Sequence, residues 1–331
     1  MESFNWGVIG PGNIAHTFAK AIASSKMGKI LAVASRSQER ADNFASTYQI
    51  EKTYYDYDQM LADPQIDIIY IATPHNFHYQ QAKMCLEAGK HVLVEKPCTV
   101  NAQQMQNLVK LAQSKKLLLQ EALWSRFMPC LFQLRQLLNE GIIGDIQYIQ
   151  SEIGFAFQNR EKSRLLKAEL AGGSLLDLGI YSITVSQFFL HEHPNKIEAM
   201  GQLTNQQVDG HVFANMHYAS GRYAQFTCSM LSQTSNTMRI VGTQGYVNLP
   251  ACFWDADTAA IYRDDKLIQS IDIPHPVNGF EYQIEESMRC IQKNMQCSTV
   301  MSHQDSVGVL KVMDEIRKQI GVTFPGGIEG V

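Results

Sequence analysis

The first third of the chain alternates short β-branched segments with amphipathic helical segments. Neighbouring parallel strands need a crossover between them, so this alternation predicts a parallel sheet covered by helices on both faces. We expect strands at 6–9, 30–35, 66–72, 91–95 and 117–120, and helices at 14–24, 38–48, 77–88 and 102–114. Asn101 is expected to cap the last of these helices at its N-terminus, and Gly89 to follow the third as a C-terminal cap.

The turn after the first strand reads Gly10-Pro11-Gly12-Asn13-Ile14-Ala15, a G-x-G-x-x-A pattern that opens a helix. Gly10 permits a tight turn, Gly12 lets a pyrophosphate approach the backbone, and Ala15 allows close packing of helix on strand. The N–H groups of Asn13 and Ile14 then stand at the positive end of the helix dipole, which favours an anion. The pattern predicts a dinucleotide site, and the alternative is a tight turn that binds nothing.

The second strand ends in Ala34-Ser35-Arg36, with Arg40 one helical turn further on. An NAD site usually has an acidic residue about 20 positions after the glycines, to bind the ribose hydroxyls. Here guanidinium groups can bind a 2′-phosphate, and the Ser35 hydroxyl avoids repelling it. We expect NADP to be preferred, with NAD possible; the alternative is that Arg36 and Arg40 are solvated surface residues.

The buried strand 91–94 delivers Glu95-Lys96-Pro97 to the carboxyl edge of the predicted sheet, where open α/β sheets bind their ligands. Pro97 restricts Lys96 to an extended conformation, so its ammonium is aimed. Such a lysine could polarise a substrate oxygen or lower the pKa of a neighbouring acid. Otherwise it simply ends a strand at the surface.

A glycine-rich segment, Gly172 to Gly179, leads into a long helix expected at 174–190. Asp177 and Tyr181 stand four residues apart on it and so share one face. From the residues alone, a structural hydrogen-bonded pair is favoured over a catalytic one.

The region after residue 121 consists mainly of consecutive strands joined by short turns, which predicts a large, mostly antiparallel sheet. The strands are expected at 146–153, 197–203, 211–218, 223–230, 238–241, 246–249, 259–262 and 267–273, with further helices at 129–140, 282–295 and 304–320. Ser302 and Asp305 are expected to cap the last helix. The predicted fold is therefore α/β: a doubly wound domain at 1–121 and an α+β domain with an open sheet at 122–331.

Composition excludes several classes of protein. A net charge of −4 over 331 residues lacks the basic excess of a nucleic-acid binder. No apolar run or N-terminal signal pattern predicts a membrane protein or an exported one. The seven scattered cysteines and the absence of a complete ligand set favour a metal-free protein in the cytoplasm.

Four segments together resemble the Gfo/Idh/MocA oxidoreductase superfamily over essentially the whole chain. They are the turn at 10–15, Thr73-Pro74-His75-Asn76-Phe77-His78, Glu95-Lys96-Pro97 and the helix that carries Asp177. Many members have Asp-x-x-x-His on that helix, whereas Tyr181 stands here in the histidine position. This departure, together with the stretch from Glu121 to Phe127, is similar to the branch of dimeric dihydrodiol dehydrogenases and NADP-dependent xylose dehydrogenases.

The resemblance implies that Lys96 and Tyr181 are the catalytic pair and that Asp177 supports them. A hydride would pass between nicotinamide C4 and a secondary alcohol or carbonyl carbon of a sugar, polyol or trans-dihydrodiol. Because a free phenol, with a pKa near about 10, is a poor base at neutral pH, the Lys96 ammonium would have to stabilise the Tyr181 phenolate.

The resemblance also implies further site residues and a partner. Cofactor contacts are expected from Thr73, Pro74, His75, His78 and Glu95, in addition to those above. Substrate contacts are expected from Trp124, Arg126 and Phe280, although aromatic residues such as Trp124 and Phe280 more often belong to a core. The open sheet is expected to form a homo-oligomer contact. The rival functions are a non-catalytic nucleotide-sensing regulator of the same fold, and an anhydrosugar reductase or inositol-type dehydrogenase.

Overall fold

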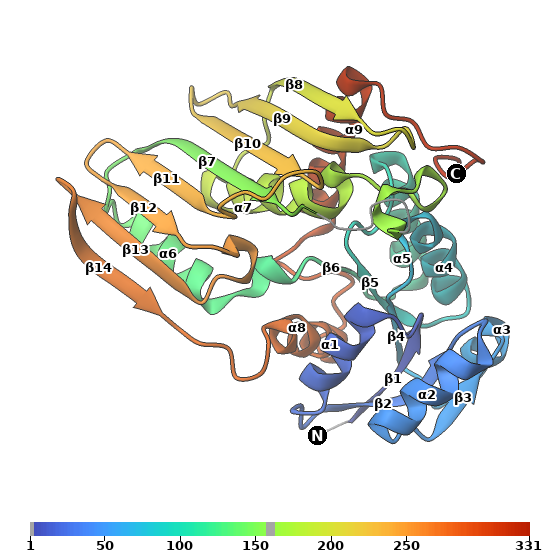
Figure 1. The fold of residues 1–331 in the computed structure, drawn as a ribbon. Coiled ribbons are helices and arrows are strands. Elements are labelled where there is room, and N and C mark those ends of the chain that lie inside the picture. Colours follow the sequence, from blue (N-terminus) through green and yellow to red (C-terminus); the bar gives the residue numbers. More distant parts are fainter. Residues whose placement is uncertain (1–2, 157–162) are drawn as a thin grey trace. The chain divides into compact units, whose positions relative to one another are not determined.

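The computed structural model describes residues 3–156 and 163–331. The chain forms two compact units, one of residues 1–124, 276–307 and 331, and one of residues 125–275 and 308–330. The first crossing lies three residues beyond the expected boundary at 121/122. The second unit differs from the expected domain, because residues 276–307 return to the first unit, where α8 packs on α1 (Figure 1).

The first unit is built on a six-stranded sheet in the order β3-β2-β1-β4-β5-β6, and every neighbouring pair is parallel. This confirms the predicted doubly wound sheet. Its strands are β1 (Phe4–Ile9), β2 (Gly28–Ala34), β3 (Lys52–Tyr54), β4 (Ile68–Ile71), β5 (His91–Glu95) and β6 (Leu119–Ala122). The short β3, and the helix after it, were not predicted because three-residue strands carry too little periodicity to detect.

Helices connect these strands and bury apolar faces against the sheet. The connecting helices are α1 (Asn13–Ile22), α2 (Gln38–Tyr48), α3 (Tyr57–Leu61), α4 (His75–Glu87) and α5 (Ala102–Lys115). Helix α8 (Phe280–Gln292) comes from much later in the chain and packs on α1. The predicted caps are confirmed: the Asn101 side chain accepts from the Gln104 N–H at 2.9 Å, and Gly89 has the positive φ of a residue that ends a helix. The core between the sheet and α1 includes Trp6, Phe18 and Tyr70.

The second unit is built on an eight-stranded sheet in the order β14-β13-β12-β11-β7-β10-β9-β8. Only the β7–β10 pair is parallel, which confirms a mostly antiparallel sheet. The strands are β7 (Ile146–Gly154), β8 (Lys196–Leu203), β9 (Asp209–His217), β10 (Tyr223–Ser229), β11 (Met238–Gly242), β12 (Tyr246–Leu249), β13 (Thr258–Arg263) and β14 (Lys266–Asp272).

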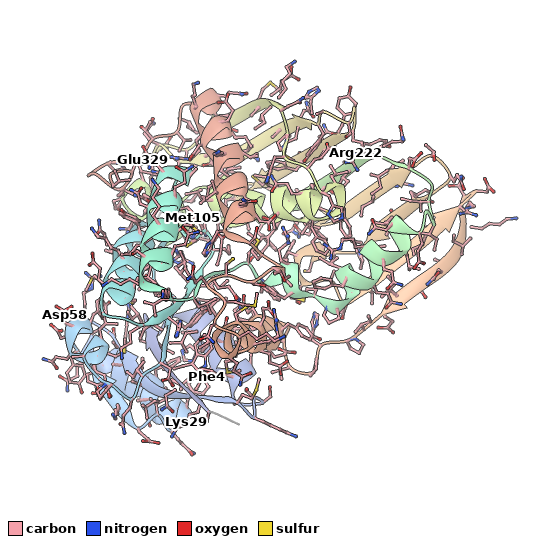
Figure 2. All side chains as sticks on the ribbon, turned by 180° about the vertical axis from the view of Figure 1, so that it is seen from behind. Phe4, Lys29, Asp58, Met105, Arg222 and Glu329 are labelled. Carbon is pink, nitrogen blue, oxygen red and sulfur yellow. The ribbon has the colours of Figure 1, made fainter. Side chains whose placement is uncertain are left out.

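Helices α6 (Pro129–Asn139) and α7 (Ile180–Leu190) lie on one face of this sheet, and side chains fill the space between them and the strands (Figures 1 and 2). The opposite face is the one on which β9 exposes Phe213 and Asn215, in alternation with buried Val212, Ala214 and Met216. Alternate residues of β9 therefore point to opposite faces of the sheet, as expected for a strand.

Two of the predicted helices show notable features at their starts. The expected helix at 174–190 begins as a π-helical turn, Leu175–Gly179, before it continues as α7, a change of winding that hydrophobic periodicity does not reveal. The last helix, α9 (His303–Ile320), starts at the predicted cap, where Ser302 and Asp305 exchange hydrogen bonds.

One described helical segment, Ala168–Leu190, is long and apolar enough to cross a membrane, with a mean hydropathy of 1.2. Because 94% of its most apolar 18-residue stretch is buried inside the protein, we interpret this segment as a core helix.

Candidate active site

The turn between β1 and α1 has the geometry that its glycines predict. Gly10 has φ of +86°, and a Cβ there would stand 2.7 Å from Thr73 Cγ2. Gly12 has φ of −97°, which any residue can adopt, and a Cβ there would meet nothing within 4 Å. Gly10 is therefore required by the fold. Gly12 is not, so its missing side chain leaves room for something other than protein.

The start of α1 is open to an anion. Its N-cap, Gly12, makes no side-chain cap hydrogen bond. Asn13 and Ile14 are the first two helical residues, whose N–H groups lack acceptors within any α-helix. Behind them Ala15 is fully buried and Gly10 N–H donates to Ala34 O at 3.2 Å, so the turn is held against the sheet. Bare backbone at Gly12 in front of an uncapped helix fits the pyrophosphate of a dinucleotide.

The end of β2 presents Arg36 in a defined position. Ser35 is buried, and its Oγ accepts from the Ser37 N–H at 3.1 Å, which shapes the turn into α2. The exposed Arg36 guanidinium lies 5.0 Å over the ring of Phe77. It also acts on Tyr57: burial raises the pKa of that phenol, while the charge of Arg36 and its hydrogen bond lower it. Arg40 is exposed on the first turn of α2.

The segment between β4 and α4 is tied to the loop after β5 by His78. This residue is fully buried, with Nδ1 2.8 Å from Pro97 O and Nε2 2.7 Å from Thr73 O. Both ring nitrogens therefore face backbone carbonyls: Nδ1 joins the two loops, and Nε2 faces a carbonyl of its own segment. Pro74 is the N-cap of α4, and the buried His75 ring lies 5.8 Å from that of His78.

Glu95 and Lys96 stand at the carboxyl end of β5, as the sequence predicts. The Glu95 carboxylate is buried, accepts from Tyr70 OH at 2.5 Å and from the Lys96 N–H at 3.3 Å, and so supports the strand end from within the sheet. Lys96 is half-buried and precedes Pro97 through a cis peptide bond.

Glu121 is a site-supporting residue that the sequence analysis did not single out. Its buried carboxylate accepts from the Cys98 N–H at 2.8 Å and from Ser306 Oγ at 2.6 Å. With His78 on the Pro97 carbonyl, two buried polar groups thus hold the two residues that follow Lys96. Only knowledge that Glu121 meets the distant Cys98 and Ser306 could have revealed this role, and a single sequence does not contain it.

The residues expected to contact the substrate differ in their burial and in the unit to which they belong. Phe280 is 2% exposed and belongs to the core of the first unit, with its ring 4.9 Å from that of Trp124. The core interpretation is therefore correct for Phe280, because α8 turns it toward α1 and the sheet. Trp124 is only partly buried. In the second unit, Arg126 is buried with its guanidinium 5.0 Å over the Phe188 ring.

Tyr181 lies against an aromatic wall in the second unit. Its ring is stacked on Trp254 at 6.0 Å, and Trp254 meets Phe155 edge-on at 5.9 Å. Tyr181 is 7% exposed, and Asp177 is partly buried in the π-helical turn just before it. Trp254 and Phe155 were not predicted, because isolated aromatic residues after strands carry no pattern that separates a pocket from a core.

Among the residues that the structure describes, no group of three or more His, Cys, Asp or Glu side chains could hold a metal ion.

Family models of known proteins match parts of both units. The model of the oxidoreductase family with an NAD-binding Rossmann fold, GFO_IDH_MocA, covers residues 4–123, and that of the GFO/IDH/MocA C-terminal domain covers residues 132–248. Trans-1,2-dihydrobenzene-1,2-diol dehydrogenases are similar over nearly the full length. The Xenopus tropicalis protein is 34% identical over 97% of this chain and 99% of its own, and the Mus musculus protein 35% identical over 98% of each.

Solved structures also resemble this chain in fold. A 3-ketoreductase from Actinomadura kijaniata, in complex with TDP-benzene and NADP, superposes with a TM-score of 0.87 at 25% identity over 96% of this chain and 98% of that one. An aldose-aldose oxidoreductase from Caulobacter crescentus, complexed with glycerol, has the same fold, with a TM-score of 0.87 at 22% identity over 96% of this chain and 97% of that one. The chain therefore belongs to the Gfo/Idh/MocA oxidoreductase family and is an NAD(P)-dependent oxidoreductase of the dehydrogenase type.

Proposed function

We propose that the protein transfers a hydride between nicotinamide C4 and a secondary carbinol carbon of a trans-dihydrodiol or a related vicinal diol, with sugars and polyols as the competing substrate class. The supporting observation is the full-length identity of about a third to trans-1,2-dihydrobenzene-1,2-diol dehydrogenases. The aromatic wall of Trp254 and Phe155 beside Tyr181 adds to it, since a ring-bearing diol would gain contact with such a wall.

In this proposal Tyr181 and Lys96 act as one unit across the two halves of the chain. Tyr181 takes the proton of the substrate hydroxyl on oxidation and returns it on reduction. The Lys96 ammonium stabilises the phenolate, which otherwise forms too rarely at neutral pH. Asp177, one helical turn before Tyr181, supports the pair, and Arg126 contacts the substrate. The nicotinamide supplies the hydride acceptor or donor when bound.

The residues of the first unit then hold the cofactor. The open helix start at Asn13 and Ile14 binds the pyrophosphate, and Gly12 lets it approach. Arg36, held over Phe77, favours the 2′-phosphate of NADP over NAD, with Ser35 and Arg40 beside it. The NADP bound by the ketoreductase relative is in keeping with this preference.

We also propose that the protein works as a homo-oligomer in the cytoplasm. The uncovered face of the eight-stranded sheet carries exposed Tyr148, Met200, Phe213 and Tyr223, more apolar surface than a sheet usually leaves to water. The seven cysteines are free thiols, as a reducing compartment would keep them.

The test is a fluorescence titration with NADPH, followed by turnover of a panel of trans-dihydrodiols, pentoses, hexoses and inositols. The proposal predicts NADPH binding and the highest kcat/KM for a cyclic vicinal diol that carries an unsaturated ring. A highest value for a hexose would assign the protein to the sugar oxidoreductases. NADPH binding without turnover of any member of the panel would instead favour the regulator.

A further inference from the structure

A buried carboxylate stands at the start of the helix that carries Asp177 and Tyr181. Asp209, the first residue of β9, is 1% exposed. Its Oδ2 accepts from the Ser174 hydroxyl at 2.8 Å and from the Leu175 N–H at 2.6 Å. These two bonds reach the residue before the π-helical turn and the first residue within it.

The chain makes room for this carboxylate at Gly173. That glycine has φ of +122°, and a Cβ there would stand 2.2 Å from Asp209 Oδ1. A side chain at residue 173 would therefore push the carboxylate away from Ser174 and Leu175. The close approach of Asp209 therefore explains the glycine at 173, while the close approach of the Leu165 carbonyl explains the one at 172.

Tyr181 lies at the start of α7, directly after this anchored turn. The π-helical turn from Leu175 to Gly179 packs tightly on β10, since a Cβ at Gly179 would stand 3.1 Å from Cys228 Sγ. Tyr181 follows two residues later. Because π-turns are held in place by their surroundings rather than by intrinsic preference, a change at the anchored end alters the direction of the side chains that follow.

We propose that Asp209 is a positioning residue of the reaction, which through Ser174 and Leu175 holds the π-helical turn so that Tyr181 presents its hydroxyl to the substrate. The proposal rests on the proposed function, in which Tyr181 transfers the substrate proton. Asp209 itself contacts neither substrate nor cofactor in this role.

The surroundings of Asp209 shift its ionisation toward neutral pH, so whether it carries a charge depends on the pH near 6. Burial raises the pKa of Asp209 to about 6, while its bonds from Ser174 and Leu175 and the charge of Arg317 act in the opposite direction. Arg317 on α9 is the cation that faces it, and the Cys228 thiol on β10, whose pKa burial raises, is the other titratable neighbour. Because the pKa of Asp209 is higher in the folded protein than in the unfolded chain, the free energy of unfolding falls as the pH rises from its ordinary value of 3.8 to about 6. Above that pH its bonds are charge-assisted, and they weaken as the pH falls through 6.

The first variant is Asp209→Asn, which keeps the shape and removes the charge. We expect its kcat at pH 8 to be about tenfold below that of the unchanged enzyme, the two pH profiles to converge below pH 6, and the Kd for NADPH to stay within twofold. A purely structural anchor would lower Tm and leave the shape of the kcat profile unchanged. An unchanged kcat profile, or a parallel loss of NADPH affinity, would overturn the proposal.

Controls separate this proposal from the function on which it rests. Asp63→Asn removes another buried carboxylate, one that holds Lys52 and Tyr54 before β4, and should leave the kcat profile unchanged. If Tyr181→Phe retains turnover, the proposed function fails; if it does not and Asp209→Asn is normal, only the positioning role fails. Should Asp209→Asn not fold, Ser174→Ala replaces it: a kcat at least threefold lower at unchanged NADPH affinity supports the role, and a normal kcat overturns it.

Discussion

Arg36 shows how far a single residue can be interpreted from sequence. The lack of an acidic residue at the end of β2, and the guanidinium in its place, predict a preference for NADP. The structure adds that the guanidinium is stacked over Phe77 and hydrogen-bonds Tyr57, so it is held in one region instead of extending freely into water. Holding it in place lowers the entropy lost when it binds a phosphate.

We therefore predict that Arg36→Ala weakens NADPH binding about tenfold and leaves NADH binding within twofold, because one exposed charge-assisted contact is lost. Fluorescence titration of both cofactors measures this. Lys29→Ala is the matched control: Lys29, labelled in Figure 2, is 56% exposed and pairs with Glu51 at 2.9 Å. Equal loss of both cofactors in the Arg36 variant would contradict the assigned preference.

His78 and Phe280 show where interpretation of single residues was insufficient. Both occupy positions that suggest ligand contact, yet His78 bridges two backbone carbonyls and Phe280 packs into a core. A histidine or an aromatic residue has the same sequence signature in either role, because the difference lies in which distant segment it meets. The same reason explains why Glu121, Trp254 and Asp209 were not found.

At the scale of elements, prediction was most successful where local chemistry decides the structure. The strand at 91–95 and the helix at 38–48 have the predicted bounds, and the caps at Asn101 and Ser302 form as expected. The strand expected at 117–120 is instead β6, Leu119–Ala122, because pairing with β5 rather than hydrophobicity sets its ends. The π-helical turn depends on anchoring by β9 and packing on β10, so it has no local signature.

The turn between β1 and α1 gives a prediction at this scale, because its two glycines serve different purposes. Gly12→Ala should keep the free energy of unfolding within about 1 kcal/mol, since φ is ordinary and the Cβ meets no protein atom. Its NADPH affinity should fall at least tenfold. Gly10→Ala should instead lose about 2 kcal/mol or more, through its positive φ and the contact with Thr73.

Denaturant unfolding of the apoprotein and NADPH titration separate the two glycines. An NADPH affinity of Gly12→Ala equal to that of the unchanged protein would show that no ligand approaches this residue.

At the scale of the whole molecule, the alternation of strands and helices predicted the first sheet and the run of consecutive strands predicted the second, but neither predicted the path of the chain between the units. Residues 276–307 return to the first unit, and this return was not foreseen because α8 is amphipathic whichever sheet it covers. The order of strands and helices was sufficient to predict two domains and could not assign the last helices to either.

The uncovered sheet face gives the prediction for the assembly. Met200 and Phe213 pair across β8 and β9 and are 73% and 50% exposed. A stable dimer buries about 800 Å² per partner. We predict that Met200→Lys with Phe213→Lys converts an oligomer into a monomer, measured by light scattering after size exclusion, whereas Tyr55→Lys in the first unit does not. A monomeric unchanged protein would refute the assembly.

The central claim is that Lys96 and Tyr181, one from each unit, act as a single catalytic pair. The most direct test is the single-turnover rate of NADP reduction by the best diol of the panel in Lys96→Met, Tyr181→Phe and the double variant, with the Kd for NADPH measured in each. The account predicts that each single variant loses about a thousandfold or more in rate and keeps NADPH affinity within about threefold, and that the double variant is scarcely slower than either, because residues that act as a unit are not additive. A near-normal rate in either single variant, or losses that multiply in the double variant, would contradict it.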